Sequence, residues 1–206
     1  MSTPDFEQAR RYALARLSSE LSPFLYYHSL SHTRDFAAPA AERLADMESL
    51  VDGDKLLLMT AVYFHDLGYL EQIAGHERIS ARIAAEALPS FGYSAEQVEV
   101  IKGIILATQL PQRPRTLLDE IMADADLDTL GREDFLEQSR ELRLELAALG
   151  NVHSDVSWYR SQLEFLRSHH YFTASQRLLR DDQKKKNIAA LVQLLADSQM
   201  MTRNSE

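Results

Sequence analysis

Histidine and aspartate side chains suited to a shared metal ion occur in two places near the start of the sequence. His28 and His32 are four residues apart, so on a helix they lie on one face. His65 and Asp66 are adjacent and follow the apolar stretch 56–64. A buried aspartate without a partner is costly, so Asp66 at the end of an apolar helix needs one. A bound metal ion would be a sufficient partner.

Two further segments add candidate ligands. His76 and Glu77 follow a glycine, and Asp124 and Asp126 lie among apolar neighbours. Imidazole nitrogen and carboxylate oxygen together suit Mn, Co, Ni, Zn or Fe, and sometimes Mg. Two histidines with two aspartates would leave coordination positions open for water and substrate. A divalent ion in such a site lowers the pKa of its water and polarises a phosphoryl oxygen.

The composition excludes several other kinds of site. The sequence has no cysteine, which rules out disulfides, cysteine zinc sites, iron–sulfur clusters and thiol catalysis. The formal net charge of −9 argues against a protein that coats nucleic acid, which needs a basic surface. A small phosphorylated substrate in a local basic pocket stays compatible with that charge. Arg113 and Arg115, which flank Pro114, are candidates to bind such a phosphate.

The absence of cysteine suits the cytoplasm, and together with the hydropathy of the chain it leads us to expect a cytoplasmic protein without a membrane partner. A chain of 206 residues fits one domain of ordinary size. The first residues have neither the basic region nor the apolar core of a signal peptide. The longest uncharged apolar stretch, 56–64, is about half of the ~20 residues that span a bilayer. Helical faces rich in leucine and alanine would suit a homodimer interface as readily as a core.

Apolar residues recur with helical spacing almost throughout, and no segment alternates convincingly as a strand. The pattern predicts helix starts at Thr3-Pro4 and at the Ser94–Gln97 capping box, and a kink or restart at Pro39. We therefore expect an all-α bundle that forms a single domain over 1–206. Its motif-bearing core covers about 20–131, and additional C-terminal helices cover about 132–200.

The order His32, then His65-Asp66, then Asp126 resembles the H…HD…D signature of the HD-domain superfamily of metal-dependent phosphohydrolases. The flanking residues at 64–69, 76–81 and 123–131 are similar to that superfamily's motifs in order and spacing. The resemblance implies an HD-type helical domain with one metal ion held by these four side chains. It selects Asp126 rather than Asp124, because a Leu-Asp pair follows the family's last aspartate.

Residues 27–32 read Tyr-His-x-x-x-His and resemble the opening motif of cyclic-nucleotide phosphodiesterases. There the first histidine protonates the leaving oxygen, so the match implies that His28 is the general acid. Asp126 or a neighbouring acid would orient the attacking water. The predicted activity is hydrolysis of a phosphomonoester or phosphodiester, with nucleotides among the substrates, by water that the metal activates.

Two positions depart from relatives of this superfamily. Members with two metals carry extra histidines after the HD pair; His76 stands where one is expected, but Thr108 stands at the next. His76, Glu77 and Asp124 therefore stay candidates for a second metal or for a role behind the first. Tyr69 stands where some HD nucleotidases place a catalytic acid. Two alternatives stay open: an HD-fold di-iron oxygenase, and a non-catalytic regulatory module that binds a nucleotide.

Overall fold

A computed structural model describes residues 3–203, and helices are the only regular secondary structure among them. The all-α prediction is therefore confirmed. The α-helices are α1 Phe6–Glu20, α2 Ala38–Met47, α3 Asp52–Phe64, α4 His76–Ala87, α5 Ala95–Leu106, α6 Leu117–Asp126, α7 Phe135–Ala148, α8 Asp155–Ser168 and α9 Ala174–Arg203. The short helical segments are η1 His32–Ala37, which is a π-helix, and the 3₁₀ turns η2 Leu67–Leu70, η3 Leu88–Phe91 and η4 Asp128–Gly131.

Contacts between residues divide the chain into two compact units, with the boundary between Leu127 and Asp128. We call them the N-terminal unit and the C-terminal unit. The boundary lies close to residue 131, where the motif-bearing core was expected to end. Within residues 3–203, no helix combines the length and the apolar character needed to cross a membrane.

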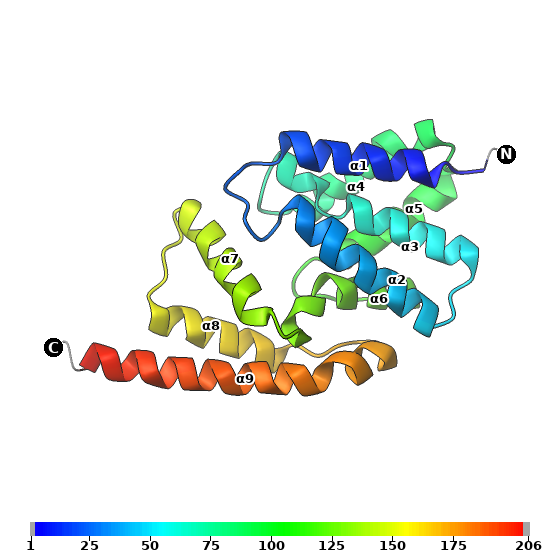
Figure 1. The fold of residues 1–206 in the computed structure, drawn as a ribbon. Helices are drawn as coiled ribbons and strands as arrows, with labels where there is room; N and C mark the ends of the chain where they lie inside the picture. Colours follow the sequence, from blue (N-terminus) through cyan, green and yellow to red (C-terminus); the bar gives the residue numbers. More distant parts are fainter. Residues whose placement is uncertain (1–2, 204–206) are drawn as a thin grey trace. The chain divides into compact units, whose positions relative to one another are not determined.

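Helix α3 is the centre of the N-terminal unit (Figure 1). It packs against α1, α2, α5 and α6, and also against α4. All side chains from Leu58 to Phe64 are buried, because the helix is apolar around its whole circumference over this stretch. Fully burying a large apolar side chain contributes about 1.5–3 kcal/mol. The apolar stretch 56–64 is thus the core helix of this unit, and the residues that follow it are anchored at its end.

Helix starts follow the local capping chemistry. The Ser94 capping box is confirmed: Gln97 N donates to Ser94 Oγ at 3.3 Å, and Ser94 N donates to Gln97 Oε1 at 2.9 Å. The predicted cap at Thr3 is wrong. The first helix begins later, and the Asp5 carboxylate accepts from Gln8 N at 2.9 Å. Aspartate caps a helix at least as well as threonine, and here Asp5 takes the role predicted for Thr3.

The predicted restart at Pro39 is confirmed. The π-helix η1 runs directly into α2, and Pro39 is the second residue of α2. Proline is tolerated in the first turn because the amide groups there have no acceptor within the helix. Single π-helical turns are rare and often occur at functional sites. This one begins at His32.

The C-terminal unit is built on the antiparallel pair α8 and α9 (Figure 1). Lys184 of α9 donates to the carbonyl of His169, the residue that ends α8, so the two helices are joined at that end. The turn η4 packs closely on α9: a Cβ at Gly131 would lie 2.5 Å from Arg180 Cβ. Arg180 holds the same turn through two hydrogen bonds to the Asp128 carboxylate, at 2.7 and 3.0 Å.

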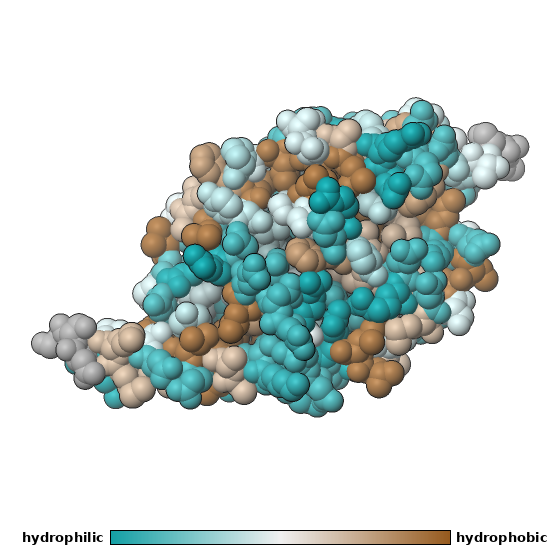
Figure 2. Space-filling view, in the orientation of Figure 1, coloured by the Kyte–Doolittle hydropathy of each residue, from teal (hydrophilic) through white to brown (hydrophobic). Residues whose placement is uncertain are grey.

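The face of the molecule drawn in Figure 2 is mostly hydrophilic, with separate apolar areas between the polar ones. This pattern agrees with a sequence in which 26% of residues are charged. Among the described residues, the most exposed large apolar side chains are Val152 and Leu178 at 81% each, both in the C-terminal unit.

Candidate functional site

His65 and Asp66 stand where the apolar helix α3 ends. His65 is the residue that caps its C-terminus, and its Nδ1 lies 2.7 Å from the carbonyl oxygen of Val62. A carbonyl oxygen only accepts, so Nδ1 carries the proton of this hydrogen bond. In the neutral imidazole, Nε2 then presents its lone pair away from the helix, which is the orientation that a metal ligand requires.

Three elements bring four predicted ligands together. His32 comes from η1, the His65-Asp66 pair from the end of α3, and Asp126 is the last residue of α6. Asp126 Oδ1 lies 3.1 Å from His32 Nε2 and 3.4 Å from His65 Nε2. The two Nε2 atoms are 3.4 Å apart, and Asp66 Oδ1 lies 3.2 Å from His65 Nε2. Asp126 Oδ1 thus lies beside both imidazoles, although Asp126 is outside the group of His32, His65 and Asp66 whose donor atoms are all mutually close.

This ligand set fits a divalent cation. Within residues 3–203, His32, His65 and Asp66 are the one group of three or more potential ligands whose donor atoms all lie within 4.8 Å of one another. Their side chains are 2%, 1% and 4% exposed, and Asp126 is 17% exposed. His32 Nδ1 and Asp66 Oδ2 are buried without a hydrogen-bond partner. Two imidazoles and two carboxylates suit Mn, Fe, Co, Ni or Zn, with Mg a weaker match.

The electrostatics show a strong demand for positive charge. Burial alone would raise the pKa of Asp66, but the charge of His65 outweighs it and holds that pKa far below its usual range. Burial would also raise the pKa of Asp126, and hydrogen bonds to His32 and His65 hold it far below. For His65, burial lowers the pKa, yet the two aspartates raise it well above 6.5. These directions favour the anionic form of both carboxylates and the charged form of His65, so the site favours positive charge.

A stack of three rings borders the cluster. The Tyr69 ring stacks on both His28 and His76, with centroid distances of 4.4 and 3.9 Å and interplanar angles of 25° and 26°, and the two histidine rings are 6.3 Å apart. The His28 and His32 rings are 6.0 Å apart, so the expected proximity is present. His28 and His32 do not share a helix, because the helical segment begins only at Leu30 and His28 lies in a bend before it. In this bend, the His28 ring stacks on the Tyr69 ring.

Gly68 sets the distance between the HD pair and helix α4. A Cβ at Gly68 would lie 2.7 Å from the carbonyl carbon of His76 and closer still to its oxygen. Gly68 N also donates to Ser80 Oγ at 2.7 Å. Only glycine permits this approach, which brings His76 Nε2 to 3.5 Å from Asp66 Oδ1. His76 therefore lies at the border of the ligand cluster, with its side chain 15% exposed.

The other candidates for a second metal site lie less centrally. Glu77 is buried; its Oε2 lies 3.8 Å from His76 Nδ1 and has no hydrogen-bond partner. Asp124 is completely buried and does not belong to the ligand group. Thr108 is buried and donates its hydroxyl to the carbonyl of Ile105 at 2.9 Å.

Arg113 and Arg115 do not contribute to the ligand group but line a cavity of about 580 Å³ in the N-terminal unit. Arg78 lines the same cavity. Sequence reasoning missed this third arginine, because it is 35 residues from Arg113 along the chain and its spacing gives no signal.

Three comparisons with known proteins bear on this site. The family model of the HD domain matches residues 25–129, more than half of the chain. No protein of curated function matches the sequence significantly. Among solved structures, the crystal structure of Bacillus subtilis YpgQ in complex with ADP matches with a TM-score of 0.65 and 18% identity, over 94% of this chain and 97% of that one. At this identity the likeness shows a shared fold.

The family match spans all four converging side chains, from His32 to Asp126. It covers the π-helix, the end of α3 and the end of α6, which are the elements that position them. The resemblance inferred from the sequence is thereby confirmed at the level of the family: this chain belongs to the HD-domain family.

Proposed function

We propose that this protein is a metal-dependent phosphohydrolase that cleaves a phosphomonoester or phosphodiester bond in a small substrate. The observation that carries the proposal is the convergence of His32 Nε2, His65 Nε2 and Asp126 Oδ1 within 3.1–3.4 Å of one another, with the Asp66 carboxylate beside them. HD domains are typically metal-dependent hydrolases, so the family supports the same reaction class.

The four ligands would hold one divalent cation, which when bound supplies a polarised phosphoryl oxygen and a water of lowered pKa. Burial keeps three of the four side chains away from solvent. Asp126 is the most exposed ligand at 17%, so its carboxylate is the group placed to orient water that enters the site. The hydrogen bond from His65 Nδ1 to Val62 fixes the imidazole before any substrate arrives.

His28 is the proposed general acid. It lies beside the ligand cluster, 6.0 Å from His32 between ring centroids, and it is not among the ligands. Its half-buried position keeps it within reach of both solvent and substrate. In the protonated form, its imidazole would donate a proton to the leaving oxygen as the phosphorus–oxygen bond breaks. The Tyr69 ring supports His28 from one side and thereby limits its rotation.

Nucleotides are the substrates to test first. The solved structure of YpgQ with ADP, which shares the fold, supports this choice. The panel should contain nucleoside mono-, di- and triphosphates and cyclic nucleotides, each with Mn, Co, Ni, Zn or Mg added. Release of phosphate or of a nucleoside monophosphate then distinguishes monoester from diester cleavage.

Asp66→Asn is the decisive variant. The substitution keeps the side-chain volume but removes a charge from the cluster. We expect the variant to lose its bound metal and its activity to fall at least ~10²-fold. Asp54→Asn, an exposed substitution in the first turn of the same helix, is the matched control and should keep both. Unchanged turnover in Asp66→Asn would refute the proposed site.

Metal content of the purified protein separates the alternatives. About one Mn, Co, Ni, Zn or Fe per chain supports the proposal. About two irons per chain with a visible absorption band would instead show an oxygen-activating di-iron enzyme. No metal after incubation with excess ions, together with tight nucleotide binding, would show a regulatory module.

A further inference from the structure

The arginine cavity of the N-terminal unit lies between α4, α5 and the loop that joins α5 to α6. Its polar wall contains Arg78, Arg113 and Arg115. Its apolar wall contains Leu106 and Leu110, which are 39% and 57% exposed. The protein has a net charge of −9, so three arginines at one cavity form a local region of positive charge in an acidic chain.

The loop sequence explains why two of these arginines reach the same cavity. Pro114 fixes its own backbone angle and favours an extended conformation for Arg113 before it. Residues 112–115 form no helix or turn. In an extended segment, alternate side chains point to the same side, so Arg113 and Arg115 face one way. Arg78 approaches from the first turn of α4.

Among the described residues, no carboxylate is paired directly with the three guanidinium groups. Within the described part of the chain, none of the three side chains makes an ion pair or a hydrogen bond that would occupy it. The one carboxylate of the cavity belongs to Asp119, and its Oδ2 already accepts from the backbone N–H groups of Arg115 and Thr116, at 3.0 and 3.1 Å. The cavity therefore has donors and positive charge available for a ligand.

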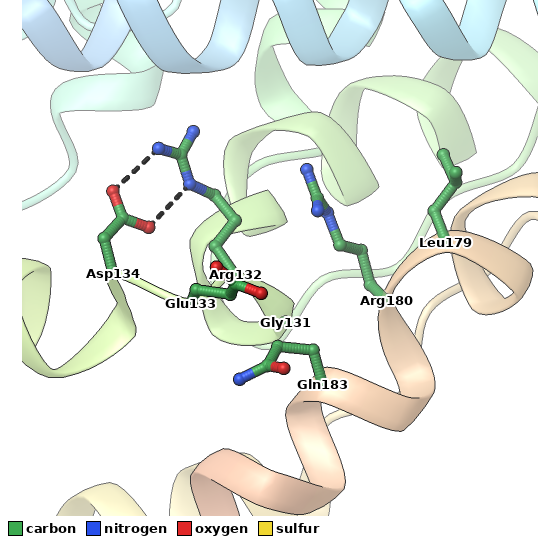
Figure 3. A pocket seen from close by; sticks show the side chains of 7 residues that line it. All are labelled: Gly131, Arg132, Glu133, Asp134, Leu179, Arg180 and Gln183. Atoms are coloured by element: carbon green, nitrogen blue, oxygen red, sulfur yellow. Dashed lines mark hydrogen bonds and ion pairs between the residues drawn. The ribbon is translucent and has the colours of Figure 1, made fainter.

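A cavity of similar volume in the C-terminal unit provides a contrast (Figure 3). It is also lined by two arginines, but both are already engaged. Arg132 binds Asp134 through two hydrogen bonds of 2.8 and 2.7 Å, drawn as dashed lines in Figure 3, and Arg180 binds Asp128 in the same way. An anion there would have to displace a carboxylate. The N-terminal cavity imposes no such cost.

None of the residues that line this cavity is a candidate metal ligand. Asp119 and Asp126 belong to α6 and are seven residues apart, which places them on one face about 10 Å from each other. An anion bound beside Asp119 would therefore lie about two helical turns from Asp126 along α6. The distance suits either a second phosphate of one extended substrate or a separate effector of the same chemistry.

We infer that this cavity binds an organic phosphate, with the phosphate on Arg78, Arg113 and Arg115 and an apolar or ring-shaped group over Leu106 and Leu110. Arginine forks bind phosphate through paired charge-assisted hydrogen bonds. The exposed Leu106 and Leu110 beside the arginines offer an apolar surface that an inorganic anion would not contact but an organic group would. A nucleoside diphosphate has both parts. The inference does not depend on hydrolysis at the metal cluster.

Calorimetric titration with ADP and with inorganic pyrophosphate, in EDTA, tests the site without metal or turnover. We expect both to bind, and Arg113→Gln to weaken both by about tenfold, the value of one charge-assisted contact. Leu106→Ala should weaken ADP and leave pyrophosphate unchanged. Arg11→Gln, which makes the same charge change at an exposed position of α1, should leave both unchanged.

Three results would overturn the inference: no binding of either probe, equal affinity in Arg113→Gln and the wild type, or an equal loss in Arg11→Gln. Repeating the titration in Asp66→Asn separates this site from the proposed catalysis, because binding should persist there while any hydrolysis is lost. Side-chain NMR signals of the three arginines that shift with ADP would support the site directly. In the metal-loaded, active protein, a raised KM in Arg113→Gln indicates that the arginines bind a phosphate of the substrate. An unchanged KM indicates that they bind a separate effector.

Discussion

At the scale of single residues, the raised pKa of His65 predicts that a cation bound at the candidate metal site displaces a proton. Without a metal, the pKa of His65 lies well above 6.5, because the charges of Asp66 and Asp126 outweigh the effect of burial. A metal ligand must be deprotonated, so binding at pH 6.5 should release about one proton and affinity should rise about tenfold per pH unit. Calorimetry in two buffers with different ionisation enthalpies measures that release. Binding without proton release at this pH would contradict the predicted role of His65.

The same groups set how stability of the metal-free protein depends on pH. The raised pKa of His65 contributes stability that is complete below pH 6.5 and is lost as pH rises through the folded-state pKa. The lowered pKa values of Asp66 and Asp126 contribute stability above pH 3.8, which is lost in acid. Urea unfolding in EDTA should therefore show declining stability on the alkaline side. Bound metal should remove that decline, since it takes the place of the proton.

Tyr69 is a positioning residue that holds two histidine rings. Tyr69→Leu keeps most of the apolar volume but removes the ring faces that contact His28 and His76. We expect kcat to fall at least ~10-fold, with metal content unchanged and the alkaline limb of the pH profile altered, because a general acid must be protonated to act. Tyr69→Phe preserves both faces and should lose less activity. If both variants lose activity equally with an unchanged pH profile, the stack does not position His28.

At the scale of elements, glycine at one position decides whether α4 can approach the HD pair. A Cβ at Gly68 would overlap the backbone of His76, so Gly68→Ala should destabilise the protein by about 3 kcal/mol. Gly53, in the first turn of α3, has open space around its Cβ position. Gly53→Ala should therefore stabilise by about 0.5–1 kcal/mol. Urea unfolding measures the change in the free energy of unfolding of both variants, provided that the dependence on urea concentration keeps its slope. If both substitutions change the stability in the same direction, the packing described at η2 is contradicted.

Prediction from the sequence worked where a pattern reports a local or family-specific constraint. The Ser94 capping box and the restart at Pro39 depend on neighbouring residues alone, and both are present. The order of the motifs is specific to one family, which the family match confirms, and it brings His32, His65 and Asp66 into one group with Asp126 beside the imidazoles. That these residues bind a metal stays a prediction. His28 and His32 do not share a helix, since spacing cannot distinguish a helical turn from a bend that is supported by a distant ring. Arg78 joins the cavity through tertiary packing, which no short-range pattern encodes.

At the scale of the whole molecule, the sequence predicts one domain, and its contacts form two compact units. The single domain stays a prediction, and Trp158 makes it testable. It is the one tryptophan of the sequence, it is buried, and it belongs to α8 of the C-terminal unit. Its fluorescence reports unfolding of that unit, whereas circular dichroism reports helices of both. One cooperative domain requires the two signals to change together.

Metal binding gives a second comparison of the Trp158 fluorescence with the circular dichroism. The candidate ligands belong to the N-terminal unit, whereas Trp158 belongs to the C-terminal unit. A cation at 100 times its dissociation constant should stabilise the folded state by about 2.7 kcal/mol. For a single domain, the Trp158 transition must shift by as much as the helical signal. Asp66→Asn should abolish the shift in both signals, which excludes non-specific effects of the salt. A shift of the helical signal while the Trp158 transition stays fixed would show that the two units unfold independently, and the single-domain prediction would then be wrong.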